Sequence, residues 1–265
     1  MNVGQALAQT QALGLDRLDA QMLVLVALSL NPHDRAWLWS HDDAMLSEEQ
    51  AARLSSLRLR RLSGEPMAYL VGWQEFHGLR LNVDARVLVP RADTETLVAW
   101  AIECLDRLDP APSTPRVLDL GTGSGAIALA LKSARPHTEV HAVDASSDAL
   151  SVAQVNAHRL GLKVRFHQGN WLEPVNAQHF NLIVSNPPYI AEGDPHMPSL
   201  RHEPRHALTA GPDGLDDLRH IVRDAPGHLA VGGWLLLEHG HDQAQAVRQL
   251  LEQAGFANVS SRTDL

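Results

Sequence analysis

From residue 116 onward, the sequence alternates short apolar runs with stretches whose apolar residues recur at helical spacing. Strands are predicted over residues 116–120, 139–143, 164–167, 181–185, 234–238 and 257–261. Helices are predicted over residues 126–133, 147–160, 216–229 and 243–254. Strands that alternate with helices form a mainly parallel sheet with helices on both faces. The pattern restricts this region to the α/β class and places ligand sites beyond the carboxyl ends of the strands.

The first 71 residues follow a different pattern. Leucines recur there at helical intervals, and strand-like alternation is absent. Residues 72–90 alternate in polarity, with a turn predicted at residues 82–84, and Pro90 ends the segment. A helix capped by Asp93 or Thr94 should follow. We therefore expect a small helical domain over 1–71, a β-hairpin linker over 72–90 and an α/β domain over 91–265.

Composition limits the classes of partner. The formal net charge is −9 with a pI near 5.9, which argues against broad binding to nucleic acid. Cys104 is the single cysteine, so the chain cannot form an intramolecular disulfide. The longest apolar run, residues 22–30, is too short to span a bilayer. We expect a soluble, cytoplasmic monomer without a membrane partner.

A glycine-rich loop separates the strand at 116–120 from its helix. It contains Gly121, Thr122, Gly123, Ser124 and Gly125. Glycines let such a turn tighten and let a ligand approach the backbone, while the next helix supplies free N–H groups. The loop also satisfies a loose dinucleotide fingerprint, so a nicotinamide cofactor is an alternative at this point.

Two further strand ends sharpen the interpretation. Asp144 ends the second strand, where its carboxylate could accept hydrogen bonds from both ribose hydroxyls. Together with the glycine loop, this resembles the S-adenosylmethionine site of class I methyltransferases. The third strand leads to Asn170 and Trp171, and Trp171 could stack on adenine. Those enzymes often have an aspartate at the position of Asn170, whose side-chain oxygen could also accept from the adenine amino group.

The most specific signal is Asn186-Pro187-Pro188-Tyr189, directly after the fourth strand. Two successive prolines fix φ and lack N–H groups, so the loop is stiff and presents acceptors. The Asn186 side-chain oxygen and the Pro187 carbonyl could accept the two hydrogens of a substrate –NH2 group. Tyr189 could pack on the planar group that carries this nitrogen. This arrangement predicts methyl transfer to a planar amide or amino nitrogen by positioning and electrostatics.

Further segments distinguish glutamine amides from adenine as the target. The sequence contains, in order, GWQEFHG at 72–78, VLVPRADTE at 87–95, VSNPPYI at 184–190, EPR at 203–205, GPDGLD at 211–216 and LLEHG at 236–240. Together they closely resemble the PrmC/HemK family of peptide-chain-release-factor glutamine methyltransferases. The resemblance is strong from about residue 72 to residue 264 and looser in the helical part.

The resemblance implies methylation of the glutamine in the Gly-Gly-Gln motif of class I release factors. It implies S-adenosylmethionine bound by residues 121–125, Asp144, Trp171 and Asn186, with the substrate glutamine on residues 186–189. The helical domain would help hold the release factor. Family members usually continue past residues 262–265 into another strand, so a strand of the sheet could be missing.

Other interpretations explain less of the sequence. An adenine methyltransferase acting on DNA or RNA is the main alternative, but it would need a basic groove or a target-reading domain. A dinucleotide oxidoreductase does not explain residues 186–189, and a non-catalytic binding module would not keep the pocket residues. His239-Gly-His241 lacks the further ligands of a metal site, so no metal is expected. Glu203 and Arg205 could pair and hold the loop between them and the Asn-Pro-Pro-Tyr segment.

Overall fold

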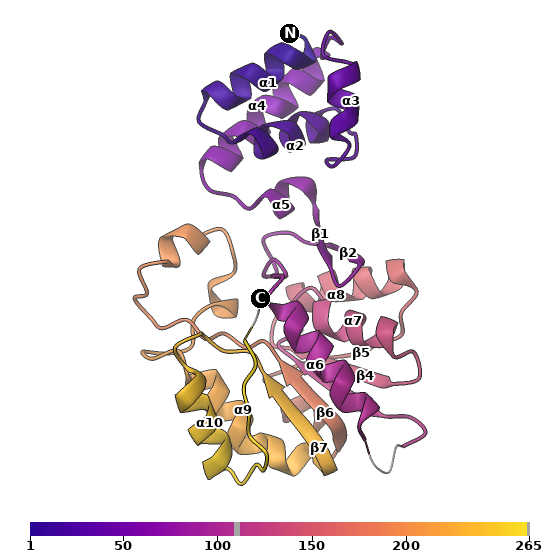
Figure 1. Cartoon of the computed structure of the whole chain (residues 1–265), viewed down its shortest axis with the longest axis vertical. Coiled ribbons are helices and arrows are strands. Elements are labelled where there is room, and N and C mark those ends of the chain that lie inside the picture. The colour runs from indigo at the N-terminus through magenta and orange to yellow at the C-terminus, as the bar shows by residue number, and fades with distance from the viewer. Residues whose placement is uncertain (109–111, 264–265) are drawn as a thin grey trace. The chain divides into compact units, whose positions relative to one another are not determined.

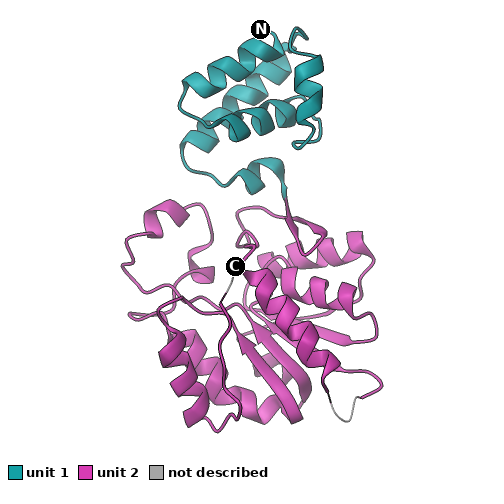
Figure 2. Cartoon of the chain, in the orientation of Figure 1, with its two compact units in different colours: residues 1–73 teal, residues 74–265 magenta. Residues whose placement is uncertain are grey.

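The computed structural model describes residues 1–108 and 112–263, and Figure 1 labels its helices and strands. The chain divides into two compact units, residues 1–73 and residues 74–265 (Figure 2). Within the described ranges, no helix combines the length and the apolar character needed to cross a membrane.

The first unit is helical. Its helices are α1 (Val3–Ala12), α2 (Arg17–Ala27), α3 (Arg35–Ser40), α4 (Glu48–Leu62) and α5 (Met67–Val71). Capping boxes start two of them: Asn2 with Gln5 begins α1, and Ser47 with Gln50 begins α4. Apolar residues of α2 pack with Leu54 and Leu57 of α4 and with Val3 and Ala6 of α1 in a buried core. The apolar residues that recur at helical spacing therefore face a common core, and capping boxes fix where two of the helices begin.

A two-stranded hairpin of β1 (Trp73–Phe76) and β2 (Leu79–Asn82) follows the helical unit. Its turn lies at His77 and Gly78, which have φ of 48° and 73°. Two central residues with positive φ make the turn that best matches the twist of a two-residue hairpin. The turn predicted at residues 82–84 was therefore wrong in position, and residues 87–89 form no strand.

The second unit contains a parallel sheet. Its strands are β3 (Arg116–Leu120), β4 (Glu139–Asp144), β5 (Arg165–Gln168), β6 (Phe180–Ser185) and β7 (Leu229–Leu237), in the order β5-β4-β3-β6-β7. The prediction of a strand over residues 257–261 was wrong for the described chain. Asn258 has a φ of 57°, a left-handed conformation that interrupts an extended segment.

Helices cover both faces of this sheet (Figure 1). The α-helices are α6 (Thr94–Asp106), α7 (Ala126–Ala134), α8 (Ser147–Leu160), α9 (Asp216–Asp224) and α10 (Ala244–Gln253). Short 3-10 helices are η1 (Glu173–Val175), η2 (Met197–Leu200), η3 (Arg205–Ala207) and η4 (Ala225–His228). Val117 packs into a core with α6 and α7, whereas its neighbour Leu118 packs into a second core with Ile221 of α9. Successive residues of β3 thus point to opposite, equally buried faces.

The strand order places a topological switch point at β3. The chain runs from β3 to β4 on one side and later returns to β6 on the other side. Ligands of open parallel sheets bind beyond the carboxyl ends of the strands at this point. The Ser185 hydroxyl donates to the Leu120 carbonyl at 2.7 Å, so the ends of β3 and β6 are tied together. The glycine loop and the Asn-Pro-Pro-Tyr loop begin directly after these two strands.

Candidate active site

The glycine loop after β3 is held to the end of β4 by its backbone. The N–H groups of Gly121 and Thr122 both donate to the Val143 carbonyl, at 2.9 and 3.0 Å. Gly121, Gly123 and Gly125 have positive φ, at 69°, 55° and 85°. A Cβ on Gly125 would also come within 3.0 Å of a leucine side chain of α7. The loop therefore needs glycine for its conformation and, at Gly125, for space.

Two of the predicted cofactor residues turn their side chains inward. The Thr122 hydroxyl donates to Asp119 Oδ2 at 2.6 Å, and Ser124 is buried. Asp119 is itself fully buried, and its Oδ1 has no hydrogen-bond partner among the described residues. Burial raises the pKa of the Asp119 carboxyl to about 7, against the lowering effect of the Thr122 hydrogen bond. Thr122 thus supports the loop from below, leaving the loop backbone to face a ligand.

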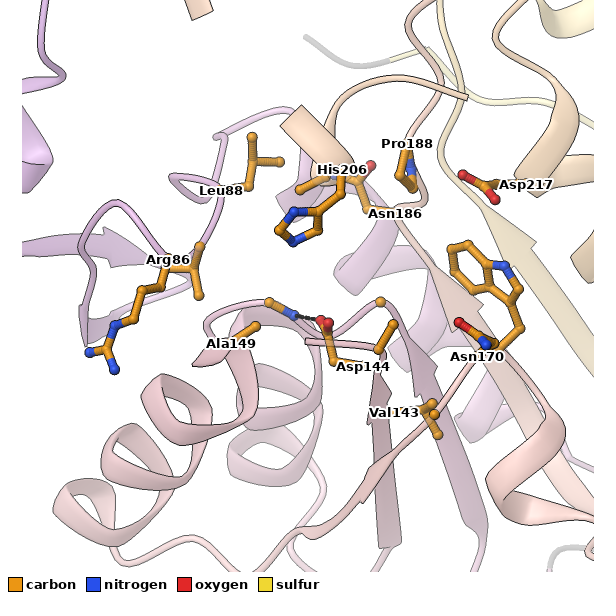
Figure 3. A pocket seen from close by; sticks show the side chains of 17 residues that line it. Arg86, Leu88, Val143, Asp144, Ala149, Asn170, Asn186, Pro188, His206 and Asp217 are labelled. Atoms are coloured by element: carbon orange, nitrogen blue, oxygen red, sulfur yellow. Dashed lines mark hydrogen bonds between the residues drawn. The ribbon is translucent and has the colours of Figure 1, made fainter. Parts of the chain in front are cut away.

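Asp144 lies at the edge of a cavity beyond the strand ends (Figure 3). Its Oδ2 accepts from the Gly123 N–H at 2.8 Å, and its Oδ1 accepts from the Ser146 N–H at 2.9 Å. These two bonds fix the carboxylate, and each oxygen keeps a second lone pair. A carboxylate held in this way can accept hydrogen bonds from the two hydroxyls of a ribose.

Trp171 lies against the glycine loop. Its Cζ3 atom would be 3.5 Å from a Cβ added to Gly121, and its backbone has a φ of 45°, unusual for a bulky residue. The indole N–H, which can only donate, lies close enough to the Asp217 carboxylate to lower its pKa. Burial raises the pKa of the Asp217 carboxyl, and Trp171 opposes this shift. The contact fixes the plane of the indole.

The cavity has a volume of about 250 Å³. It is lined by six of the predicted site residues, namely Gly121, Gly123, Asp144, Trp171, Asn186 and Pro188. Asn186 and His206 lie across it from Asp144 (Figure 3). Asn170 also lines it, as the sequence suggested. An acid for a diol, an aromatic face and an open glycine backbone fit the adenosyl and amino-acid parts of S-adenosylmethionine.

Several other lining residues had not been predicted as site residues, among them Arg86, Leu88, His206 and Asp217. Arg86 and Leu88 follow the hairpin, and His206 belongs to η3. Asp217 is in the first turn of α9, where the sequence indicates only a helix start. Leu88 belongs to the family-like segment at 87–95, but no local pattern assigned any of these four residues to the cavity, which they reach through long-range folding.

The Asn-Pro-Pro-Tyr loop is divided between the cavity and the protein interior. Asn186 and Pro188 line the cavity, whereas Pro187 is buried and Tyr189 packs beside Leu237. The Tyr189 hydroxyl donates to Glu238 Oε1 at 3.2 Å, and the Gln243 amide donates to the Tyr189 carbonyl at 2.9 Å. Burial raises the pKa of the Tyr189 phenol, and the Glu238 carboxylate raises it further. The loop is held at its aromatic end.

The other end of the loop is held by α6. Asn186 Nδ2 donates to Thr94 Oγ1 at 3.0 Å. Glu238 lies beside this pair, burial raises its pKa, and its Oε2 has no hydrogen-bond partner among the described residues. Asn186 therefore reaches the cavity from a polar cluster that the protein shields from water.

Glu203 holds the loop that follows Tyr189, but not through the predicted pair with Arg205. Its carboxylate accepts from the Val89 N–H at 3.0 Å and from Arg91 Nη2 at 2.5 Å. The Glu203 side chain is only 3% exposed, whereas that of Arg91 is 39% exposed, so the ion pair lies at the border between the interior and solvent. The expected Glu203–Arg205 pair was wrong because the segment before α6 supplies both a closer cation and a backbone donor.

Metal ligands do not gather at this site. Over residues 1–108 and 112–263, no three His, Cys, Asp or Glu side chains are grouped so that they could hold a metal ion. His239 Nδ1 lies 2.8 Å from the carbonyl of the next residue.

Comparison with known proteins supports the class of the α/β unit. Residues 101–203 match the model of the methyltransferase small domain, and residues 3–72 match that of the PrmC N-terminal domain. The solved hMettl16 catalytic domain in complex with MAT2A 3'UTR hairpin 1 is 14% identical, with a TM-score of 0.55 over 79% of this chain and 73% of that chain. A SAM-dependent methyltransferase from Agrobacterium tumefaciens is 18% identical, with a TM-score of 0.51 over 69% of this chain and 57% of that chain. These structures share the fold, and the unit is a Rossmann-like class I methyltransferase.

Curated relatives define the family. The release factor glutamine methyltransferase of Xylella fastidiosa is 49% identical over 95% of this chain and 90% of its own length. That of Bordetella pertussis is also 49% identical, over 95% and 92%. The Escherichia coli enzyme is 43% identical over 98% and 92%. The chain therefore belongs to the release factor glutamine methyltransferase family.

Proposed function

We propose that this protein transfers the methyl group of S-adenosylmethionine to the side-chain amide nitrogen of a release factor glutamine, the one in the Gly-Gly-Gln motif of class I factors. One observation carries the proposal. A single cavity brings Gly121 and Asp144, which fit the cofactor, together with Asn186, which can bind an –NH2 group.

The cofactor side of the cavity serves to bind and orient. Asp144 accepts the ribose hydroxyls, and Trp171 offers its face to adenine. The loop of residues 121–125 lets the amino-acid portion of the cofactor lie close to the backbone. When bound, S-adenosylmethionine supplies a methyl group on a positively charged sulfur. The residues on this side hold that methyl toward Asn186.

The substrate side positions the amide nitrogen. Asn186 Oδ1 accepts one amide hydrogen and the Pro187 carbonyl accepts the other, which turns the nitrogen lone pair toward the methyl group. As the nitrogen loses planarity, both contacts gain strength, so they stabilise the transition state more than the bound substrate. Tyr189, fixed by Glu238, packs on the planar amide. No strong base is needed before transfer.

The helical unit is proposed to hold the release factor. Large apolar side chains exposed on this unit are Leu13, Leu18, Trp39, Met45, Leu59 and Leu62. Trp39 is 69% exposed. The Arg17 guanidinium lies over its ring, with Cζ 5.2 Å from the ring centroid. Exposed aromatic and apolar groups of this kind favour a protein partner.

We also propose a protein substrate rather than nucleic acid, and a cytoplasmic monomer. The net charge of −9 supports the first point, because neutralising a phosphate backbone requires clustered cations. Release factors act in the cytoplasm, where cysteines stay reduced. The single cysteine of this chain is free and buried, which agrees with that compartment.

The test is methyl transfer from labelled S-adenosylmethionine to four acceptors: a release factor, its Gly-Gly-Ala variant, and adenine-containing DNA and RNA. We expect label on the wild-type release factor alone. Label on nucleic acid would instead support an adenine methyltransferase, and label on the Gly-Gly-Ala variant would place the acceptor elsewhere on the factor.

A further inference from the structure

Glu238 is a buried carboxylate beside the reacting loop. It directly follows β7, and its N–H donates to the Ser185 carbonyl at 3.0 Å. This bond extends the pairing of β6 and β7 by one step and places Glu238 next to Asn186. The side chain thus enters the site from a neighbouring strand of the rigid sheet.

The Thr94, Tyr189 and Asn186 side chains near this carboxylate are potential donors, and the Asp93 carboxylate lies near enough to raise its pKa. The Tyr189 hydroxyl donates to Oε1 at 3.2 Å, whereas Oε2 has no partner in normal geometry among the described residues. Thr94 and Asn186 lie close enough to lower the pKa of Glu238 by hydrogen bonding, although burial outweighs them. Thr94 is 4% exposed, so no bulk water competes for its hydroxyl.

The hydrogen bonds of this cluster run in one direction, from Asn186 through Thr94 to Glu238. A carboxylate only accepts hydrogen bonds, so the Thr94 hydroxyl hydrogen is drawn toward Glu238. The Thr94 oxygen is then left as an acceptor, and Asn186 Nδ2 donates to it at 3.0 Å. Because the NH2 end of the Asn186 amide faces Thr94 and Glu238, its Oδ1 end faces away from them, toward the substrate side.

We propose that Glu238, acting through Thr94, is a positioning residue that determines which end of the Asn186 amide faces the substrate. The inference rests on the proposed function, in which Asn186 Oδ1 accepts a hydrogen of the substrate amide. If the direction of the cluster were reversed, Asn186 would present its NH2 group to the substrate –NH2 group. Two donors would then face each other, and the nitrogen would not be oriented.

The Glu238→Gln substitution tests the direction of the cluster. The glutamine amide can donate to Thr94, whose hydroxyl can then donate to Asn186 Oδ1 and turn that amide over. At saturating cofactor and release factor, we expect kcat to fall by about 100-fold, the scale of one lost transition-state hydrogen bond. Cofactor affinity measured by calorimetry should be unchanged, because Glu238 does not line the cofactor cavity.

Glu139→Gln is the matched control. Glu139 starts β4, at the end of the sheet opposite to the site, and its carboxylate also accepts from side chains. His141 Nε2 lies 3.0 Å from it and Arg165 Nη1 lies 2.8 Å from it. This variant loses a charge from a similar polar cluster, so it should affect stability while kcat is retained.

A pair of Thr94 variants tests the same direction without changing charge. Thr94→Val replaces the hydroxyl by a methyl group of similar size and should lose turnover as Glu238→Gln does. Thr94→Ser keeps the hydroxyl and should retain most of the turnover. A purely structural role predicts the reverse order, because valine fills the buried site better than serine does.

A readout independent of methyl transfer separates this inference from the proposed function. In the wild-type protein, the Asn186 side-chain NH2 hydrogens should exchange slowly with solvent in NMR, and Thr94→Val should speed their exchange. Wild-type turnover in Glu238→Gln or Thr94→Val, or equal exchange rates, would overturn the positioning role. A wild-type protein that leaves the release factor unmethylated but shows slow Asn186 exchange would refute only the proposed substrate.

Discussion

The two ends of the cavity each depend on a buried carboxyl group, but the groups are held differently. Asp119 lies beneath the glycine loop and accepts from Thr122 and Ala128, both within nine residues of it. Glu238 lies beside the Asn-Pro-Pro-Tyr loop and is contacted by Tyr189, 49 residues away, and by Thr94 from the start of α6. Each carboxyl has one buried oxygen without a partner among the described residues.

This difference reflects what each end must do. The proposed cofactor end would hold a ligand through backbone shape, and that shape comes from one short strand–loop–helix segment fastened to the end of β4. The chemical end must orient the side-chain amide of Asn186, which follows β6. This requires Thr94 from α6 and Glu238 from the end of β7. Substitutions at the cofactor end should therefore change affinity, whereas those at the chemical end should change turnover.

The largest effect should come from Asn186→Ala. We expect kcat to fall by about 100- to 1,000-fold, because the substrate nitrogen loses an oriented acceptor in the transition state. Cofactor affinity, measured by calorimetry, should change little. Equal losses of affinity and turnover would remove the distinction between the two ends.

Asp119→Asn tests the buried acid at the cofactor end through pH. A pKa raised to about 7 means that the folded state favours the neutral carboxyl. The resulting stability is fully present below the unfolded pKa, near 4, and is lost as the pH rises to about 7, at about 1.4 kcal/mol per pH unit.

Asparagine cannot ionise, so this variant should gain stability relative to the wild type between pH 4 and pH 7. Urea unfolding of both proteins across this range would measure the gain. A constant difference in the free energy of unfolding would show that Asp119 does not titrate there.

Asp144→Ala should weaken cofactor binding by about 1–3 kcal/mol, since a charge-assisted contact to the ribose is lost. Turnover at saturating cofactor should remain close to that of the wild type. Asp148→Ala, at the exposed start of α8, is the control with the same charge change. Unchanged affinity in Asp144→Ala would exclude Asp144 as the ribose ligand.

The smallest effect should come from Tyr189→Phe. This change removes the hydroxyl that donates to Glu238 but keeps the ring, which we propose packs on the substrate. We expect about 1 kcal/mol lower stability and a loss of turnover below about tenfold. A loss as large as that of Asn186→Ala would mean that the hydroxyl, and not the ring, contributes most.

Much of the α/β fold could be predicted because its signals are local. The apolar runs and the helical periodicity located β3, β4, β6 and the helices between them to within a few residues. The glycine loop could be identified for the same reason, since Gly121, Gly123 and Gly125 each adopt a conformation that favours glycine.

The errors have a common physical cause. The hairpin turn was predicted at an Asn-x-Asp pattern, but pairing of the strands selected His77 and Gly78. The Glu203–Arg205 pair was predicted from closeness in sequence, whereas the fold brought Arg91 to Glu203. Asp217 was missed because only tertiary packing places the start of α9 beside Trp171. Contacts between residues far apart in the sequence leave no local pattern from which they could be predicted.

The most direct test of the difference between the two ends is single-turnover methyl transfer to the release factor with each variant saturated in S-adenosylmethionine. We predict a near wild-type rate for Asp144→Ala and a rate lower by about 100-fold or more for Asn186→Ala. Similar rates for the two variants would contradict the claim that the loops after β3 and β4 bind the cofactor while the loop after β6 orients the nitrogen.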